Sequence, residues 1–263
     1  MAIIPKKVVE RFSKTVGSFQ RVLKTAKDRD VNEADTVSIV SDILAKVFGF
    51  DKYLEITSEF AVRNTYCDIA IKVNGKIQYL IEVKAIGLDL KEHHLRQIVE
   101  YGSNQGVQWV VLTNGISWEI YRIRFEKPIN YDLVCSFNFL ELSAGKADAQ
   151  ERLFLLCKEG LRRSVREDFY GHIQSVNRFT IGAIVLGDEA IRLIKRELRK
   201  LSSGIKIENS EIEVILKNEV LKREVIEGKA ALKAKKRVRR ISGKSSNKSR
   251  VSKPISELPS ESV

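Results

Sequence analysis

The chain has 263 residues and a formal net charge of +12, and 43% of its residues are hydrophobic. This length suffices for one large domain or for a medium domain with an appendage, and the hydrophobic fraction is enough for a core. Apolar runs are too short for a membrane span, and a signal sequence is not apparent, so we expect a cytoplasmic protein without membrane contact. Three widely spaced cysteines and three histidines argue against a disulfide framework, a Cys/His zinc site and histidine-based catalysis.

The first predicted elements are two helices followed by a sheet. Residues 6–28 repeat apolar side chains at helical spacing, and a second helix is expected from Asn32, an acceptable N-cap, to about residue 47. From residue 54 the period becomes that of strands, and Asn74-Gly75 and Asn114-Gly115 favour tight hairpin turns. The remaining elements of this part are three strands, a helix and two strands, at 54–62, 67–73, 77–84, 88–104, 109–113 and 117–125. This order predicts an α/β fold with a mixed central sheet flanked by helices.

After Pro128 the pattern changes and becomes mainly helical. One more short strand is expected within residues 131–142. Helices are then predicted at 148–163, 167–178 and 188–201, and a further one begins at Ser210. We therefore divide the chain into a sheet domain (1–130), a mainly helical accessory region (131–227) and a tail (228–263).

The tail is rich in basic residues. Eleven Lys/Arg residues and no acid lie between Lys229 and Lys253, and removing their charge from the net +12 leaves +1 for the rest of the chain. Such a segment suits a polyanion, although a solvated solubility tail has the same composition. We expect disorder here, with a helical first part as an alternative. The candidate nucleic-acid contacts in it are Lys235, Lys236, Arg237, Arg239 and Arg240.

Three charged residues in the first hairpin require an explanation, because the strands around them are apolar. Asp68 begins one strand, and Glu82 and Lys84 lie in the next. Counting back from the Asn74-Gly75 turn brings Asp68 and Glu82 within one residue of facing each other. Glu82 and Lys84 are two residues apart and therefore share one face of the sheet. The sequence thus predicts two carboxylates and one ammonium group in a single cluster.

This cluster has the composition of a metal-dependent phosphodiesterase site. Two carboxylates held together repel each other unless a cation joins them. Mg²⁺ is the natural ion for hard oxygen ligands that leave room for water and phosphate. We expect Asp68 and Glu82 to bind Mg²⁺, with the Val83 carbonyl as a further ligand and Mn²⁺ as a substitute. Lys84 would orient or help to deprotonate the attacking water, or stabilise the charge that develops on phosphorus. An ordinary exposed cross-strand charge pattern is the alternative.

The spacing resembles that of the PD-(D/E)xK nuclease superfamily, in which an acid is followed across a hairpin by Glu-x-Lys. Here the motif reads Asp68 and then Glu82-Val83-Lys84, and Cys67 stands where a proline often precedes the first acid. The order of a helix, a three-strand meander, a helix and two strands is also similar to that core. The resemblance implies a restriction-endonuclease-like fold.

Gln97 and Tyr101 extend the resemblance to a narrower group. Gln-x-x-x-Tyr on the helix after the Lys84 strand is similar to a motif in the N-terminal nuclease domains of type I restriction enzyme R subunits and in RecB-like nucleases. The resemblance implies that Gln97 helps position DNA or the metal site, that Tyr101 supports it, and that Glu33 points toward the metal. A GxxxxGK[ST] motif is missing, so we expect a stand-alone domain without a helicase motor.

These features lead to a Mg²⁺-dependent DNA endonuclease of a restriction or defence system as the expected function. Lys91 and Arg96, on the same helix as Gln97, are candidate phosphate contacts. The alternative is a nuclease fold that grips nucleic acid or a protein partner without cutting it. DNA is the expected nucleic acid, RNA stays open, and protein partners or a homo-oligomer are left undetermined.

Overall fold

The structure is a computed structural model that describes residues 3–62, 65–162, 164–201 and 204–248. The chain forms two compact units, Met1–Tyr170 and Gly171–Val263, and each is considered by itself. None of the helices within the described ranges is both long and apolar enough to cross a membrane.

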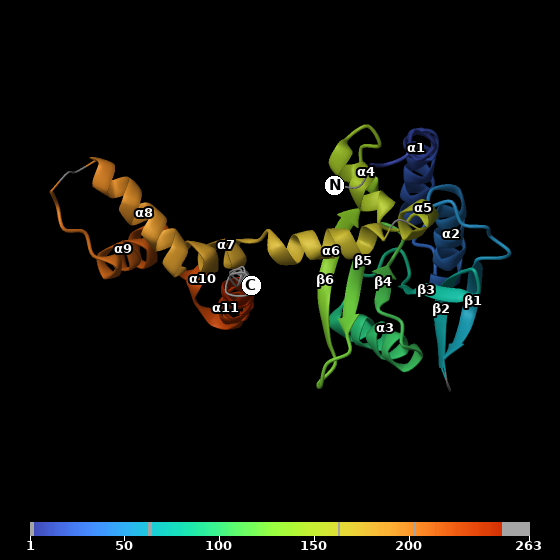
Figure 1. Ribbon diagram of the computed structural model, residues 1–263. Helices are drawn as coiled ribbons and strands as arrows, with labels where there is room; N and C mark the ends of the chain where they lie inside the picture. Colours follow the sequence, from blue (N-terminus) through green and yellow to red (C-terminus); the bar gives the residue numbers. More distant parts are fainter. Residues whose placement is uncertain (1–2, 63–64, 163, 202–203, 249–263) are drawn as a thin grey trace, which may run out of the picture. The chain divides into compact units, whose positions relative to one another are not determined.

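The first unit is built on one six-stranded sheet whose strands follow chain order (Figure 1). Strands β3 and β4 pair in parallel, and all other neighbours pair antiparallel. The strands are β1 (Ile56–Val62), β2 (Thr65–Val73), β3 (Lys76–Val83), β4 (Trp109–Thr113), β5 (Ser117–Arg124) and β6 (Asn130–Asn138). The predicted mixed sheet is therefore confirmed.

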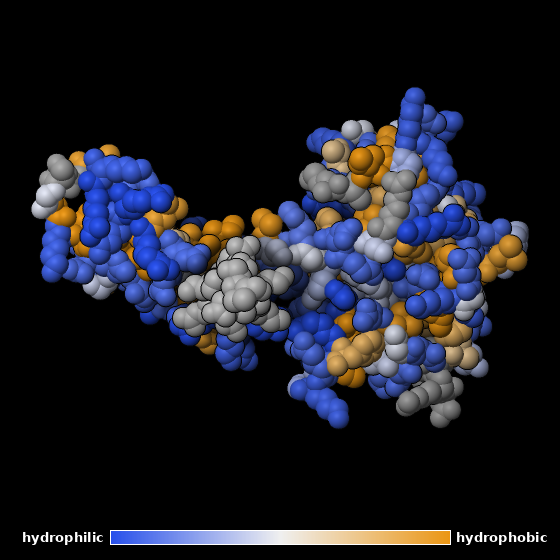
Figure 2. Space-filling model, viewed as in Figure 1, coloured by the Kyte–Doolittle hydropathy of each residue, from blue (hydrophilic) through white to orange (hydrophobic). Residues whose placement is uncertain are grey.

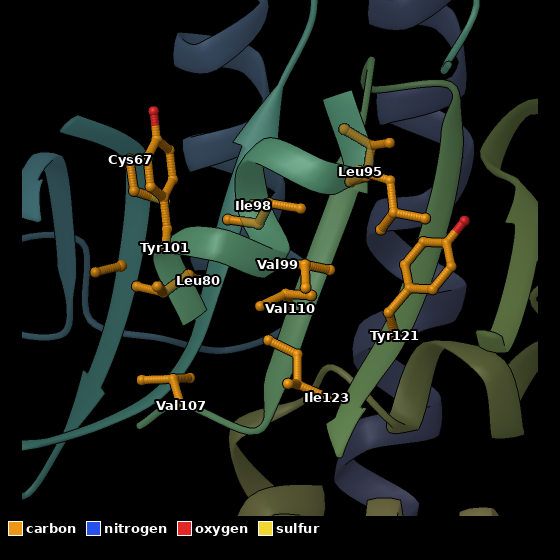
Figure 3. Packing of buried hydrophobic residues seen from close by; sticks show 12 residues of the cluster. Cys67, Leu80, Leu95, Ile98, Val99, Tyr101, Val107, Val110, Tyr121 and Ile123 are labelled. Carbon is orange, nitrogen blue, oxygen red and sulfur yellow. The ribbon is translucent and has the colours of Figure 1, made fainter. Parts of the chain in front are cut away.

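Helices cover both faces of this sheet. Helix α3 (Glu92–Gln105) connects the parallel strands and packs on the face that carries Leu80, Val110 and Tyr121 (Figure 3). Helix α2 (Glu33–Lys46) contacts β2 and β3 and lies, with α1 (Lys6–Asp28), behind the sheet in that view. The sheet is thus buried on both sides, which is why β3 and β4 are almost continuously apolar.

Helix α3 lies very close to the sheet at Gly102. A Cβ atom at this position would lie 2.8 Å from Val110 Cγ1 and 3.1 Å from the Val107 carbonyl oxygen. We expect Gly102→Val to lower the free energy of unfolding by about 1–3 kcal/mol, because the helix must move away from its packing surface. Urea denaturation measures this change. Gly17→Val, at an exposed helical site with open space around it, is the matched control, and equal losses in both variants would contradict the packing argument.

The first unit extends past the boundary predicted at residue 130. Strand β6 pairs with β5 along its length, and Tyr79 Oη donates a hydrogen bond of 2.9 Å to the Leu156 carbonyl. The helix predicted at 148–163 is divided into α4 (Ala147–Phe154) and α5 (Lys158–Arg162), because the intervening Leu155–Cys157 segment buries all of its side chains. These contacts fix the segment to the sheet, so the unit ends at Tyr170.

The second unit is helical, as predicted, with a small core around Ile191, Ile212 and Leu216. Figure 2 shows hydrophilic residues over much of the visible face of α8 (Asp188–Leu201) and α9 (Asn209–Ile215), with hydrophobic residues between them. The first part of the basic segment is a helix, and residues 249–263 lie outside the described residues. Including α6, which begins in the first unit, the elements are α6 (Val165–Ser175), α7 (Arg178–Val185), α8 (Asp188–Leu201), α9 (Asn209–Ile215), η2 (Leu216–Val220), α10 (Arg223–Ile226) and α11 (Gly228–Lys248).

Candidate active site

A β-bulge in the β2–β3 hairpin sets the register of the candidate site. The register shifts between Ile71 and Lys72, which leaves Gln78 as an extra residue on β3. Past the bulge, continuing the pairing by one step places Asp68 opposite Glu82. The count from the turn put these two carboxylates one residue out of register. The bulge removes that offset, so both side chains belong to the same face of the sheet.

Side chains replace the backbone ladder where β2 and β3 approach the site. The Val83 N–H donates a hydrogen bond of 2.7 Å to Asp68 Oδ2. Cys67 stands at the position where a proline often precedes the first acid. Its buried thiol donates a hydrogen bond of 3.2 Å to the Ile81 carbonyl oxygen. The Asp68 carboxylate is therefore held in place by the backbone of β3, directly beside Glu82.

Lys84 joins Glu82 to a third carboxylate from another element. Its Nζ atom lies 2.8 Å from Glu82 Oε1 and 3.5 Å from Glu33 Oε2. Glu82 is 1% exposed and Lys84 9% exposed, whereas Glu33 is half-exposed at the first turn of α2. The Asn32 side chain caps this helix by accepting a hydrogen bond from the Asp35 N–H. The α2 N-terminus thus brings Glu33 to the end of β3.

The three carboxylates carry more negative charge than Lys84 balances. Burial raises the pKa of Glu82 to about 7, the nearby charge of Asp68 adds to the shift, and Lys84 opposes it. The pKa of Asp68 is also raised, with burial as the largest cause, while the Val83 N–H bond and Lys84 act in the opposite direction. Burial alone would lower the pKa of Lys84, but its bond to Glu82 and the charges of Glu33 and Asp68 raise it overall. A bound cation would relieve this imbalance.

The oxygens present fit one Mg²⁺ ion with a small protein ligand set. Among the described residues, Glu82 Oε2 is buried and has no hydrogen-bond partner, which leaves it free for a ligand. The described part of the chain contains no group of three or more His, Cys, Asp or Glu residues placed to hold a metal ion. Mg²⁺, however, is commonly bound by one or two carboxylates together with water and phosphate. Asp68 and Glu82 meet that smaller requirement, and a ligand role for the Val83 carbonyl stays a prediction.

Gln97 and Tyr101 lie together on α3, one helical turn apart. Gln97 Nε2 donates a hydrogen bond of 2.9 Å to Tyr101 Oη, and the interactions described for Gln97 do not include Asp68, Glu82 or Lys84. Tyr101 is 8% exposed and belongs to the apolar cluster under α3, together with Cys67 (Figure 3). The hydrogen bond joins the two side chains, while the expected roles of Gln97 and Tyr101 toward DNA or the metal site stay predictions.

The other predicted phosphate contacts of this unit lie at the N-terminal end of α3. Lys91 is exposed and is the N-cap residue, and its N–H donates to His94 Nδ1 at 3.2 Å. Arg96 is exposed but forms an ion pair of 2.7 Å with Glu92. Lys91 has no ion-pair partner among the described residues, so its ammonium group is available to a phosphate. Arg96 would have to exchange its ion pair with Glu92 for a contact with phosphate.

Three further residues lie around the site without a motif that marks them. The pKa of His94 is lowered, with burial as the largest cause and the positive charge of Lys84 as a smaller one. Glu59 on β1 raises the pKa of Asp68 as a minor contributor. The buried Asn114 side chain donates to the Leu88 carbonyl at 2.8 Å and so holds the loop that follows Lys84. The Asn-Gly pattern identified Asn114 only as a turn residue. Its hydrogen bond to Leu88 joins residues that are 26 positions apart, so a local sequence pattern does not reveal it.

The basic residues predicted to contact nucleic acid lie on α11 in the second unit. Lys235, Lys236, Arg239 and Arg240 are exposed. Arg237 is half-buried, and its guanidinium donates to the Gln174 carbonyl and to Ser175 Oγ. The Arg237 guanidinium, which was predicted to contact nucleic acid, is therefore engaged by residues of its own unit.

Residues 42–134 match the family model described as the type I restriction enzyme R protein N terminus. The match spans β1 to β5, α3 and most of β6, so it contains Asp68, Glu82, Lys84 and the Gln97–Tyr101 pair. Glu33 and α11 lie outside it. No curated protein and no solved structure matches the chain. The match supports a nuclease-like domain of a restriction system for this part of the molecule.

Proposed function

We propose that the first unit is a Mg²⁺-dependent endonuclease that hydrolyses DNA phosphodiester bonds in a restriction or defence system. The observation that carries the proposal is the buried Glu82 carboxylate, which has one oxygen on Lys84 and the other without a partner, opposite Asp68 in the sheet. Burying such a group is costly unless it serves a ligand. The restriction-enzyme match over the same residues supports this reading.

Each residue of the cluster has a defined part in this mechanism. Asp68 and Glu82 would hold Mg²⁺, which when bound supplies Lewis-acid stabilisation of the phosphate and a more acidic water. Asp68 is kept in place by the Val83 N–H. Lys84 is oriented by Glu82 and Glu33, and its one remaining N–H would be available to the attacking water or to a phosphate oxygen without a large reorganisation.

A non-cleaving nucleic-acid-binding module is the second candidate. It is favoured by the Lys84–Glu82 ion pair, which satisfies one carboxylate oxygen, and by the finding that the described residues contain no three His, Cys, Asp or Glu side chains grouped so as to hold a metal ion. Against it, a protein that only binds polyanions gains nothing from carboxylates at the centre of its site. The two candidates differ in one measurable property, which is strand cleavage.

Plasmid cleavage in the presence of Mg²⁺ tests the proposal. We expect the wild type to nick supercoiled DNA with Mg²⁺ or Mn²⁺ but not with EDTA, and Asp68→Ala and Lys84→Ala to be slower by about 100-fold or more. Asp148→Ala is the control, because Asp148 is a highly exposed acid on α4. Equal nicking by all four proteins would exclude this site, and no cleavage by any of them would favour the binding module.

A further inference from the structure

Helix α11 is anchored to its own unit along one face. Ala231 and Ala234 are 6% and 8% exposed, and the helix packs on α7 and α10. Arg237 adds hydrogen bonds to the Gln174 carbonyl and Ser175 Oγ in the last turn of α6, where a cation also interacts favourably with the helix dipole. The small side chains and this arginine fix which side of α11 faces outward.

The outward side carries a stripe of four basic residues, here called the α11 stripe: Lys229, Lys233, Lys236 and Arg240. At about 100° per residue these four fall within about 60° of one another, on the side opposite Ala231 and Ala234. All four are exposed. No hydrogen bond or ion pair is found for them within residues 204–248. Since a run of like charges is repulsive in itself, the stripe favours a polyanionic ligand.

The chemistry of the helix selects one class of polyanion. A helix that binds an anionic membrane needs an apolar face for the lipid, but the Ala231/Ala234 face of α11 is already covered by α7. The exposed Leu232 and Ile241 lie on opposite sides of the helix, about 180° apart, and so do not form such a face. Single-stranded nucleic acid is gripped by stacking on aromatic rings, and Gly228–Lys248 contains none. Binding to the backbone of a duplex requires neither an exposed apolar face nor aromatic rings. The stripe is about 16 Å long at 1.5 Å per residue, and over that length duplex DNA presents roughly ten phosphate charges.

We propose that the α11 stripe binds the phosphate backbone of double-stranded DNA without base specificity. Backbone contacts by lysine and arginine position a protein on the duplex but carry no sequence information. The inference concerns binding alone, and it does not require that the first unit hydrolyse DNA. The two functions are therefore tested separately, with binding measured in the absence of divalent metal.

The test is a salt titration of binding to a labelled mixed-sequence duplex in EDTA. If about four phosphates are contacted, the affinity of the full chain should fall about 100-fold between about 50 and 200 mM salt. Replacing all four stripe residues by glutamine should weaken binding by about 10-fold or more at the lower salt and reduce the log–log slope by about 3 to 4. Circular dichroism checks that the helices are retained.

A matched variant separates the stripe from net charge. Lys200, Lys206, Lys217 and Arg223 belong to the same unit, and each is ion-paired with a glutamate. Changing these four to glutamine removes the same charge and should leave the salt slope nearly unchanged. Equal loss of binding in both variants would overturn the proposal. So would tighter binding to single strands than to the duplex, or stripe-dependent binding to phosphatidylserine vesicles in place of DNA.

Discussion

Lys84→Met is expected to lower the free energy of unfolding of the first unit by about 3 kcal/mol at pH 8. The substitution keeps the length of the side chain but removes the one cation that contacts Glu82 among the residues that the structure describes, leaving a carboxylate that is 1% exposed without that counter-charge. Urea denaturation followed by tryptophan fluorescence reports on this unit alone, because Trp109 and Trp118 both lie in it.

The loss should depend on pH in a defined direction. Burial already raises the pKa of Glu82 to about 7, and Lys84 opposes that shift. Removing Lys84 therefore raises this pKa further, so that Glu82 is protonated and neutral at pH 6 in the variant. A carboxyl group with a raised pKa in the folded state destabilises the fold as pH rises through that pKa. The difference between wild type and Lys84→Met should consequently be smaller at pH 6 than at pH 8.

A double variant identifies the cause of the loss. In Glu82→Leu/Lys84→Met both charges are absent, and stability should return to near the wild-type value or above it. Lys46→Met, which breaks an exposed ion pair with Asp42, should change stability by less than about 0.5 kcal/mol. If the double variant were as unstable as Lys84→Met, the loss would come from packing of the lysine chain and not from the unpaired carboxylate.

The parts of the site that the sequence predicted are those set by local geometry. The Asn74-Gly75 turn fixes the β2–β3 hairpin, and the two-residue strand period puts Glu82 and Lys84 on one face. The bulge at Gln78 was not foreseen, because no residue around it requires a distortion. It is nevertheless the feature that turns an offset of one residue into direct opposition of the carboxylates.

The parts that could not be predicted depend on contacts between distant segments. Glu33 reaches Lys84 across 51 residues, and only the packing of α2 beside β3 determines that distance. The Gln-x-x-x-Tyr spacing predicted that Gln97 and Tyr101 adjoin, which is a local property of a helix. It did not predict that Tyr101 would be buried with Cys67. The charge run after Gly228 indicated a polyanion, but the arrangement of its lysines emerged only with the helix.

Glu82→Gln is expected to separate cleavage from DNA binding. The amide is close in shape to the carboxylate, and its oxygen still accepts a hydrogen bond from Lys84, so the fold should be retained. The variant loses one negative metal ligand, and cleavage with Mg²⁺ should fall by about 100-fold or more. Without metal, however, the same change removes a negative charge from a site that would lie against phosphates. DNA affinity in EDTA should therefore increase several-fold.

The two opposite changes make this variant more informative than a simple loss of activity. A denatured or misassembled protein would lose both properties, and a surface effect would alter binding alone. Glu126→Gln removes the same charge from an exposed position and should change neither. If Glu82→Gln cleaved DNA as fast as the wild type, Glu82 would not be a metal ligand. Increased binding in EDTA by a protein that never cleaves would instead identify the first unit as a DNA-binding module, in which Glu82 limits the affinity for DNA.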